Sequence, residues 1–357
     1  FAPLEVQFAD VALWQQRELG SPSDPDSVVS HQLSFWRDQL AGLPDVLALP
    51  TDRPRPTVAT MRGAEIPFEI PAATAEAVRQ VAASSGVTEF MVVHAALAVL
   101  MSRLAATDDV AIGTPIAGRG DAVLDPLVGM FVNTLVLRTA IDPAQSFVDL
   151  LDEVRIVDLD AFAHSEAPFE TVVEAVQPVR SESFAPLVQV LLTFTPAAID
   201  PSAVVADLDD LAVGIVEVEE TTSKVDLTVG LRGARDGGWV GTANYATDLF
   251  DENSIRQMMN RFADILVALT SDVTRPIGDA PLLSAAEVER LTPVGDVAGT
   301  PPELLADIFA DAALRRPEHV AVEDPERSLT YRELDEASNR LARYLLRRGV
   351  GVETLVA

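Results

Sequence analysis

The sequence contains no cysteine, which excludes disulfide bonds, thiolate nucleophiles and cysteine-based zinc sites. Lysine is almost as scarce, because Lys224 is the only one, whereas arginine is plentiful. Only four histidines occur, and they are His31, His94, His164 and His319. No two of them are adjacent or spaced as metal ligands usually are. Cysteine chemistry and histidine-based metal chemistry are therefore not expected of this chain.

Long apolar runs are also absent. The strongest one, Phe90 to Met101, is shorter than the roughly 20 residues that span a bilayer, and it contains His94. No targeting segment is visible after Phe1. With 55 acidic and 26 basic residues the net charge is -29, which argues against a nucleic-acid or anionic-membrane partner. We expect an acidic protein of the cytoplasmic type.

The pattern of apolar residues predicts an α/β fold. The chain is 48% hydrophobic, which is ample for a core. The periodicity predicts helices over 6–16, a segment ending at 40, 73–84, 88–104, 146–163 and 251–269, with Thr88 and Asp251 as caps. It predicts strands over 65–70, 110–116, a segment ending at 139, 187–194, 213–218, 225–231 and 239–245. Such alternation calls for layered α/β architecture.

A change of composition marks a domain boundary. Pro276 to Pro302 is rich in proline, glycine, aspartate and threonine, so we predict a first domain over 1–280, a linker over 281–302 and a second domain over 303–357. The chain starts without methionine and ends on residues typical of the start of a strand. We therefore expect it to be a piece of a longer protein.

One motif combines buried polar residues with an apolar strand. It runs from Val128 to Arg138, where Gly129 predicts a hinged turn and Asn133 and Arg138 interrupt a buried strand. Burying such groups costs about 1–3 kcal/mol each unless they find partners, so such residues usually have a role.

This motif resembles a signature of condensation domains in nonribosomal peptide synthetases, and further blocks of the chain agree in order and spacing. These blocks are Phe8–Gln15, Leu49–Pro56 after Phe35-Trp36 and Leu40–Gly42, Gly129–Thr134 with Arg138, His164–Glu170, Arg180–Gln189, Thr222–Leu227 and Tyr245–Phe250. Departures occur at Ser165 and Glu166, and at Val188, where the family usually has an aromatic residue. The resemblance covers about residues 1 to 290.

The end of the chain resembles a second family. Ser328–Leu334, followed by Ser338–Ala342, is similar to the first block of adenylation (AMP-binding) domains. The resemblance implies that the phosphate loop, the specificity pocket and the catalytic lysine of such a domain lie after Ala357. ATP and Mg²⁺ would then serve only the complete adenylation domain.

The resemblance implies a fold and a reaction. The fold would be that of chloramphenicol-acetyltransferase-like acyltransferases, with two α/β lobes and a tunnel between them, and this chain would supply the second lobe. The reaction would join carrier-bound aminoacyl or peptidyl thioesters through an amide bond. The partners would be donor and acceptor peptidyl-carrier domains, each with a phosphopantetheine arm, and the rest of the synthetase. The family's His-His-x-x-x-Asp-Gly block is absent from these residues, so we expect the chain alone to be inactive.

The site residues that the resemblance implies line the substrate tunnel. They are Gly129, Met130, Asn133, Thr134, Arg138, His164, Ser223 and Lys224. If Asn133 faces the tunnel, Asn133→Leu should slow amide formation and leave the fold intact.

Structural alternatives stand beside these roles. Asn133 can equally pin its strand to neighbouring backbone. Arg138 favours an ion pair, with Asp10 or Glu166 among the candidates. Lys224 and Asp226 favour a half-buried pair, His164 favours a hydrogen bond that holds the turn before Pro168, and His94 favours a satisfied core position.

Three other functions compete with an amide-forming elongation module. A non-catalytic domain could keep the fold as a docking platform for carrier or tailoring proteins. A stand-alone CoA-dependent acyltransferase is disfavoured by the adenylation start, and an orphan fragment without activity is the simplest alternative. The adenylation start also argues against an epimerising relative, because such a domain usually ends its module.

Overall fold

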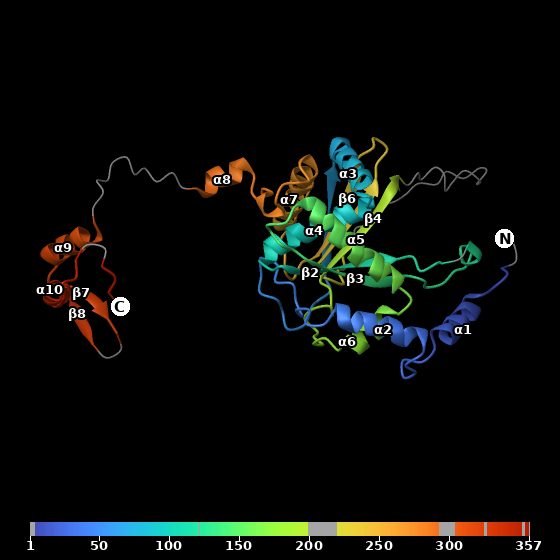
Figure 1. Cartoon of the computed structure of the whole chain (residues 1–357), viewed down its shortest axis with the longest axis horizontal. Coiled ribbons are helices and arrows are strands. Elements are labelled where there is room, and N and C mark those ends of the chain that lie inside the picture. The colour runs from blue at the N-terminus through green and yellow to red at the C-terminus, as the bar shows by residue number, and fades with distance from the viewer. Residues whose placement is uncertain are drawn as a thin grey trace. The chain divides into compact units, whose positions relative to one another are not determined.

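The computed structural model describes residues 4–120, 122–198, 220–292, 304–324, 327–351 and 354–356 of the chain (Figure 1). Contacts divide the chain into two compact units, residues 1–285 and 286–357. The expected strand over 213–218 and the second half of the expected linker lie outside the described residues. The domain boundary at 281–302 stays a prediction.

A six-stranded sheet organises the first unit (Figure 1). Its order is β1 (Gly63–Ile70), β6 (Trp239–Ala246), β5 (Leu227–Gly233), β4 (Val190–Ala198), β2 (Asp109–Ile116) and β3 (Asn133–Ala140). The pairs β2–β4 and β4–β5 are parallel, and the other neighbours are antiparallel. Parallel pairing brings the carboxyl ends of β2, β4 and β5 to one edge of the sheet.

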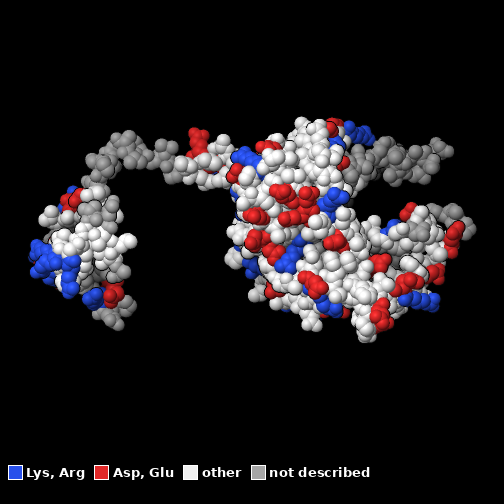
Figure 2. Space-filling model, viewed as in Figure 1, with Lys and Arg blue, Asp and Glu red and all other residues white. Residues whose placement is uncertain are grey.

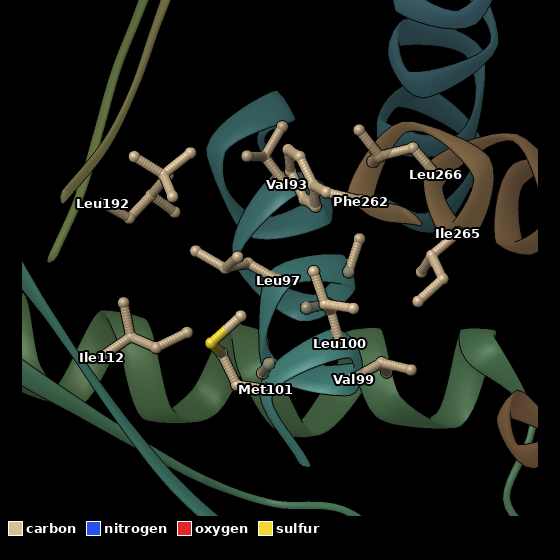
Figure 3. Close-up of a cluster of buried hydrophobic side chains, with 14 of the residues drawn as sticks. Val93, Leu97, Val99, Leu100, Met101, Ile112, Leu192, Phe262, Ile265 and Leu266 are labelled. Carbon is tan, nitrogen blue, oxygen red and sulfur yellow. The ribbon is translucent and has the colours of Figure 1, made fainter. Parts of the chain in front are cut away.

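The main core is built around one buried helix. Helix α4 (Glu89–Ala105) is buried from Met91 to Ser102, and it contacts α3 (Ala72–Ser85), α5 (Phe147–Ala163) and α7 (Glu252–Ser271). Figure 3 shows α4 between strand residues Ile112 and Leu192 on one side and Phe262 of α7 on the other. Its nearly uniform apolar surface suits a helix enclosed on all sides. As predicted, the Thr88 side chain caps it by accepting a hydrogen bond from the Met91 amide at 3.2 Å.

A second core lies beside β3. Helices α2 (Val28–Gln39) and α6 (Phe169–Val176) bury Trp36, Leu33 and Val172 against Leu135 and Leu137. Helix α1 (Phe8–Leu19) precedes them and has no buried residue, so that Trp14 is 58% exposed. Two short 3₁₀ turns, Ala122–Leu124 and Ile277–Asp279, complete this unit.

An extended arm over 49–62 crosses from these helices to β1. Its prolines forbid helix, and its side chains bind distant parts of the unit. Arg53 pairs with Asp251, Arg55 pairs with Asp226, and Thr60 donates hydrogen bonds to Asp248. These ion pairs and hydrogen bonds attach the arm to the residues that flank β5 and α7.

Two details of the expected elements are wrong. Asp251 stands at the N-cap of α7, but its carboxylate binds Arg53 and makes no capping hydrogen bond. Strand β4 starts at Val190 and not at 187, because Leu187 adopts a left-handed φ of 66°. The buried Gln189 side chain accepts a hydrogen bond from the Leu47 amide and donates to the carbonyls of Asp45 and Ala185. These bonds fix the position of the backbone just before β4.

The second unit has helices and a small hairpin. Helix α8 (Ala285–Leu291) begins at the boundary of this unit, and α9 (Leu305–Arg315), β7 (Val320–Glu323), β8 (Ser328–Thr330) and α10 (Tyr331–Arg347) follow. Thr330 and Glu333 form a capping box at the start of α10. Hydrogen bonds from Thr330 lower the pKa of the Glu333 carboxyl. No described residue after 286 is buried.

No single helix of the described stretches has the length and apolar composition to cross a membrane. Helices α3 and α4 satisfy these criteria only as a pair, and they are bent by 107° where they join. Figure 2 shows acidic side chains spread over the visible face of the first unit, with basic side chains between them.

Candidate functional site

Gly129 and Met130 lie in the exposed connection between β2 and β3. Met130 is 75% exposed. A Cβ on Gly129 would stand 2.2 Å from the Phe8 ring, so a larger residue there would displace this ring of α1 from its contact with the connection. The backbone bends at Gly129 before β3, as the predicted turn requires, although the glycine with a left-handed φ in this connection is Gly118, at 62°. Phe8 completes the contact by packing edge-on against Phe131 at 5.2 Å.

Asn133 begins β3 and fills its hydrogen-bonding capacity with backbone groups. Its Nδ2 donates to the carbonyls of Ser165 and Ala167, both at 2.9 Å. Its Oδ1 accepts from the amides of Thr134 and Phe169, also at 2.9 Å. The side chain therefore joins the strand to the block that follows α5, which is the structural alternative from the sequence. A role in the tunnel wall stays a prediction for Asn133 and for half-buried Thr134.

His164 is held in the same block by three interactions. Its ring stacks on Phe35 with centroids 3.8 Å apart. Its Nδ1 lies 2.8 Å from the Asp160 carbonyl, and because a carbonyl only accepts, Nδ1 must carry the proton. Its own carbonyl accepts from Trp36 Nε1 at 3.0 Å. These bonds agree with the expected structural role before Pro168.

Arg138 is committed to a structural ion pair at the other end of β3. Its guanidinium binds both carboxylate oxygens of Asp109, at 2.8 and 2.7 Å, and donates to the carbonyls of Gln39 and Ala41. The hydrogen bonds with Asp109 raise the pKa of Arg138. The ion pair was expected, but neither Asp10 nor Glu166 is the partner. Through these hydrogen bonds the planar guanidinium of Arg138 fixes the end of α2 to the edge of the sheet.

Ser223 and Lys224 lie beside the arm, at a cavity of about 360 Å³. The Ser223 hydroxyl is buried and donates to the Val225 carbonyl at 2.7 Å. The expected Lys224–Asp226 pair is wrong, because Asp226 binds Arg55 through both oxygens while Lys224 is exposed. The serine and the lysine share this cavity with Arg55 and Asp226.

The predicted residues therefore occupy separate places. Asn133 and His164 meet in one hydrogen-bonded block, and Gly129 and Met130 lie in the preceding connection. Arg138 is five residues along β3 from Asn133, which is about 17 Å in a strand. Ser223 and Lys224 line a different cavity.

A larger cavity of about 810 Å³ contains none of the predicted residues. It opens at the carboxyl ends of the parallel strands β2 and β4, where Thr114 to Ala117 and Thr193 to Thr195 line it. The start of α4 and Phe162 of α5 form the rest of its wall. Such crevices beyond parallel strand ends are common ligand sites. Sequence patterns located both strands, but they contain no signal that β2 and β4 are parallel neighbours.

No group of three or more His, Asp or Glu side chains within the described ranges could hold a metal ion. The cavity has polar hydroxyl groups from threonine and an apolar wall that includes Phe90, Phe162 and Ile116. Its chemistry suits an organic ligand with both apolar and hydrogen-bonding parts.

Comparison with protein families assigns both parts of the chain. Residues 2–292 match the family model described as Condensation domain, and residues 309–357 match the model described as AMP-binding enzyme.

Curated relatives and solved structures agree with these matches. The chain is 44% identical over 362 residues to a probable non-canonical nonribosomal peptide synthetase, CymA, of Salinispora arenicola, and covers 5% of its length. It is 40% identical over 367 residues to the isonitrile lipopeptide synthase of Mycobacterium tuberculosis, and covers 14% of it. Both alignments include 100% of this chain, which thus spans a small part of either relative.

The X-domain from teicoplanin biosynthesis, in a structure of its complex with OxyB, superposes with a TM-score of 0.73 and 29% identity. That superposition covers 80% of this chain and 62% of the X-domain chain.

Proposed function

Because the chain belongs to the condensation-domain family of nonribosomal peptide synthetases, with the start of an AMP-binding enzyme behind it, we propose that it is part of an amide-forming elongation module. In this proposal residues 1–280 are the second lobe of the condensation domain. The lobe would help to join carrier-bound aminoacyl or peptidyl thioesters. The order of the two family matches in one chain, condensation first and AMP-binding second, carries the proposal.

The proposed partners are donor and acceptor carrier domains and the rest of a synthetase. Their phosphopantetheine arms would bring the thioesters, and the cavity beyond β2 and β4 supports a site for them by its volume and mixed lining. ATP and Mg²⁺ would serve a complete adenylation domain only. Cytoplasmic placement stays a prediction.

The catalytic base is proposed to lie outside these residues. The chain has no adjacent histidines, and His94 and His164 are both engaged inside the fold. We propose that residues 1–357 alone form no amide bond. They would contribute part of the wall of the substrate tunnel and contacts to the carrier domains. A general base must come within hydrogen-bond reach of the amine. His94 is fully buried, and His164 is half-buried with its Nδ1 bonded to the Asp160 carbonyl.

A docking platform is the second candidate function. It is favoured by the superposition on the X-domain, a protein recorded in complex with OxyB. The platform would keep the fold and bind a carrier or tailoring protein without forming an amide.

The reading frame around this segment separates the two candidates. An intact His-His-x-x-x-Asp-Gly block before Phe1, together with a full adenylation domain after Ala357, would support the elongation module. A degenerate histidine block in an otherwise continuous frame would overturn it in favour of the platform. Stop codons at both ends of this segment would contradict any amide-forming role.

A further inference from the structure

Helix α5 exposes an apolar stripe to solvent. Ile156, Leu159 and Phe162 follow one another at intervals of three residues and are 62%, 52% and 42% exposed. Residues three apart are neighbours on the surface of a helix, so these side chains form one strip that climbs about 9 Å along the axis. Single exposed apolar residues are normal on a protein surface, whereas a contiguous row of large ones marks an interaction site.

A cavity borders each end of the α5 stripe. Ile156 lines a cavity of about 480 Å³, whose wall also includes the end of β3 and Gln39 of α2. Phe162 lines the cavity beyond β2 and β4. Pockets beside an apolar row accept the large side chains of a partner, and such buried anchors contribute most of the binding energy of an interface. The cavity at Ile156 therefore offers a place for an anchor side chain.

Carboxylates form the rim of the α5 stripe. Asp152, Glu153 and Asp160 of α5 are exposed, and the ion pairs in the described part of the first unit use other carboxylates. The one basic residue of α5, Arg155, reaches toward the end of α3, where its Nη1 lies 3.8 Å from the position of a Cβ on Gly86. Helix α5 runs across the face on which acidic side chains gather in Figure 2. The rim is therefore negative.

The negative rim decides which occupant fits the α5 stripe. A second copy of the chain would bring the same carboxylates to the contact, and an anionic lipid surface would bring phosphates, so like charges oppose both. A partner with basic side chains around an apolar row has the complementary charge pattern. A helix carries such a row at the same spacing, and it packs along another helix with the axes about 8–10 Å apart.

We propose that the α5 stripe is a docking site for a basic amphipathic helix of a partner protein. Leu159 lies at the centre of the contact, and a large apolar side chain of the partner fills the cavity at Ile156. Arginine or lysine side chains of the partner pair with the carboxylates of the rim. The inference goes beyond amide formation, because it concerns an exposed helix face and names the chemistry of what binds there.

Helix α7 offers a matched control position. Val267 is 50% exposed and is the one large apolar residue of α7 that is exposed in the described structure. Leu159 lies four residues before the end of α5 at Ala163, and Val267 lies four residues before the end of α7 at Ser271. Helix propensity and the helix dipole therefore affect Leu159→Glu and Val267→Glu alike, and the two variants differ in whether they disrupt the α5 stripe.

The experiment titrates the intact 357-residue chain with three designed peptides of about 14 residues, and measures affinity by calorimetry at about 0.15 M salt. The first peptide has a leucine row at helical spacing and arginines on its rim. The second has the same row with glutamates, and the third has the composition of the first in scrambled order. We expect the first peptide to bind at least about tenfold more tightly than the other two. Leu159→Glu should weaken its binding at least about tenfold, because a carboxylate replaces the apolar centre of the contact, and Val267→Glu should leave it unchanged.

Nonspecific attraction to the net charge of -29 gives a different result. Binding by charge alone would make the scrambled peptide equal to the first, and Leu159→Glu, which adds a negative charge, would not weaken it. Either result overturns the proposal, and so does tighter binding of the glutamate peptide. The comparison of peptides on the unmodified chain decides this even where Leu159→Glu does not fold.

Sedimentation of the chain without peptide tests the other occupant. A dimer that Leu159→Glu dissociates would mean that a second copy covers the α5 stripe, and this would overturn the proposal. A monomer with both side chains agrees with it. No carrier or amide product is measured in either experiment, so failure here leaves the proposed function untouched.

Discussion

The Asn133 side chain makes four hydrogen bonds with backbone groups of the candidate site. It bonds three residues of the block after α5 as well as its own neighbour Thr134. Gln32 of α2 adds to this block by accepting from the amides of Glu166 and Ala167. The hydrogen bonds of a single amide thereby set the position of α6 relative to β3.

Replacing Asn133 with leucine should destabilise the first unit. We expect a loss of about 3 kcal/mol, because several backbone groups lose partners at about 1–3 kcal/mol each. A loss of this size lowers the stability without unfolding the domain, so the expectation from sequence that the fold stays intact remains a prediction. Urea unfolding followed by tryptophan fluorescence measures this, since Trp14, Trp36 and Trp239 all lie in the first unit. Asn244→Leu, which loses one exposed bond to Thr222, is the control and should cost under about 1 kcal/mol. Equal costs would contradict the assignment.

Asp52 provides a pH-dependent test at the same scale. A hydrogen bond from the Asp251 amide, followed by one from Ser254, lowers the pKa of the Asp52 carboxyl. A depressed folded-state pKa contributes stability above the unfolded pKa, and this stability is lost as pH falls through the folded pKa. Asp52→Asn should therefore cost less than about 1 kcal/mol near neutral pH, because the group is exposed. The difference from the unmodified chain should shrink as the pH falls below the ordinary aspartate pKa of about 3.9. A difference that is constant with pH would refute the role of Asp52.

Between elements, α4 and α5 enclose a fully buried pair of ionisable residues. His94 Nδ1 lies 3.0 Å from Asp158 Oδ1, and both side chains are 0% exposed. The atoms are within ion-pair distance, but their alignment is not that of a hydrogen bond, and His94 Nε2 and Asp158 Oδ2 have no partner among the described residues. The satisfied core histidine expected from sequence is thus buried as predicted but only partly satisfied.

A double-mutant cycle tests this pair. His94→Leu should destabilise the first unit by about 3–5 kcal/mol, because it leaves a buried carboxylate alone. Adding Asp158→Leu should restore stability to within about 1 kcal/mol of the unmodified chain, since apolar pairs of similar volume often replace buried ion pairs without cost. Tryptophan fluorescence in urea reports both variants. Additive losses in the double variant would mean that the two residues act independently.

The sequence predicted the helices and strands better than it predicted which of them lie next to one another. Apolar periodicity located α4, α5, β5 and β6 within a few residues, because burial on one or all sides leaves a local pattern. The partner of Arg138 was missed, since Asp109 lies on the neighbouring strand and pairing is not a local property. The cavity beyond β2 and β4 was missed for the same reason. The family and fold class, in contrast, were predicted from the order of blocks and are confirmed by the family and structure matches.

At the scale of the whole molecule, the two units differ in burial. The first unit has a large continuous core around α4, whereas no described residue after 286 is buried. Leu314, Leu341 and Leu346 are 82%, 58% and 68% exposed. Regions with few buried contacts open locally at low free energy.

Hydrogen exchange measured by mass spectrometry should show this difference. Peptides from α4 should stay protected until global unfolding, and peptides from α9 and α10 should exchange at least about a hundredfold faster. Peptides from α1, which has no buried residue, are an internal control and should also exchange fast. Equal protection in α4 and α10 would contradict the burial difference.

The most direct test of the account is single-turnover amide formation by the intact polypeptide that contains this segment. Donor and acceptor carriers loaded with thioesters are mixed with it, and the acceptor-bound product is measured by mass spectrometry. The account predicts that the acyl group moves from the donor thioester to the acceptor amine. A polypeptide that binds both carriers but leaves the donor thioester intact would contradict the amide-forming role and support the docking platform.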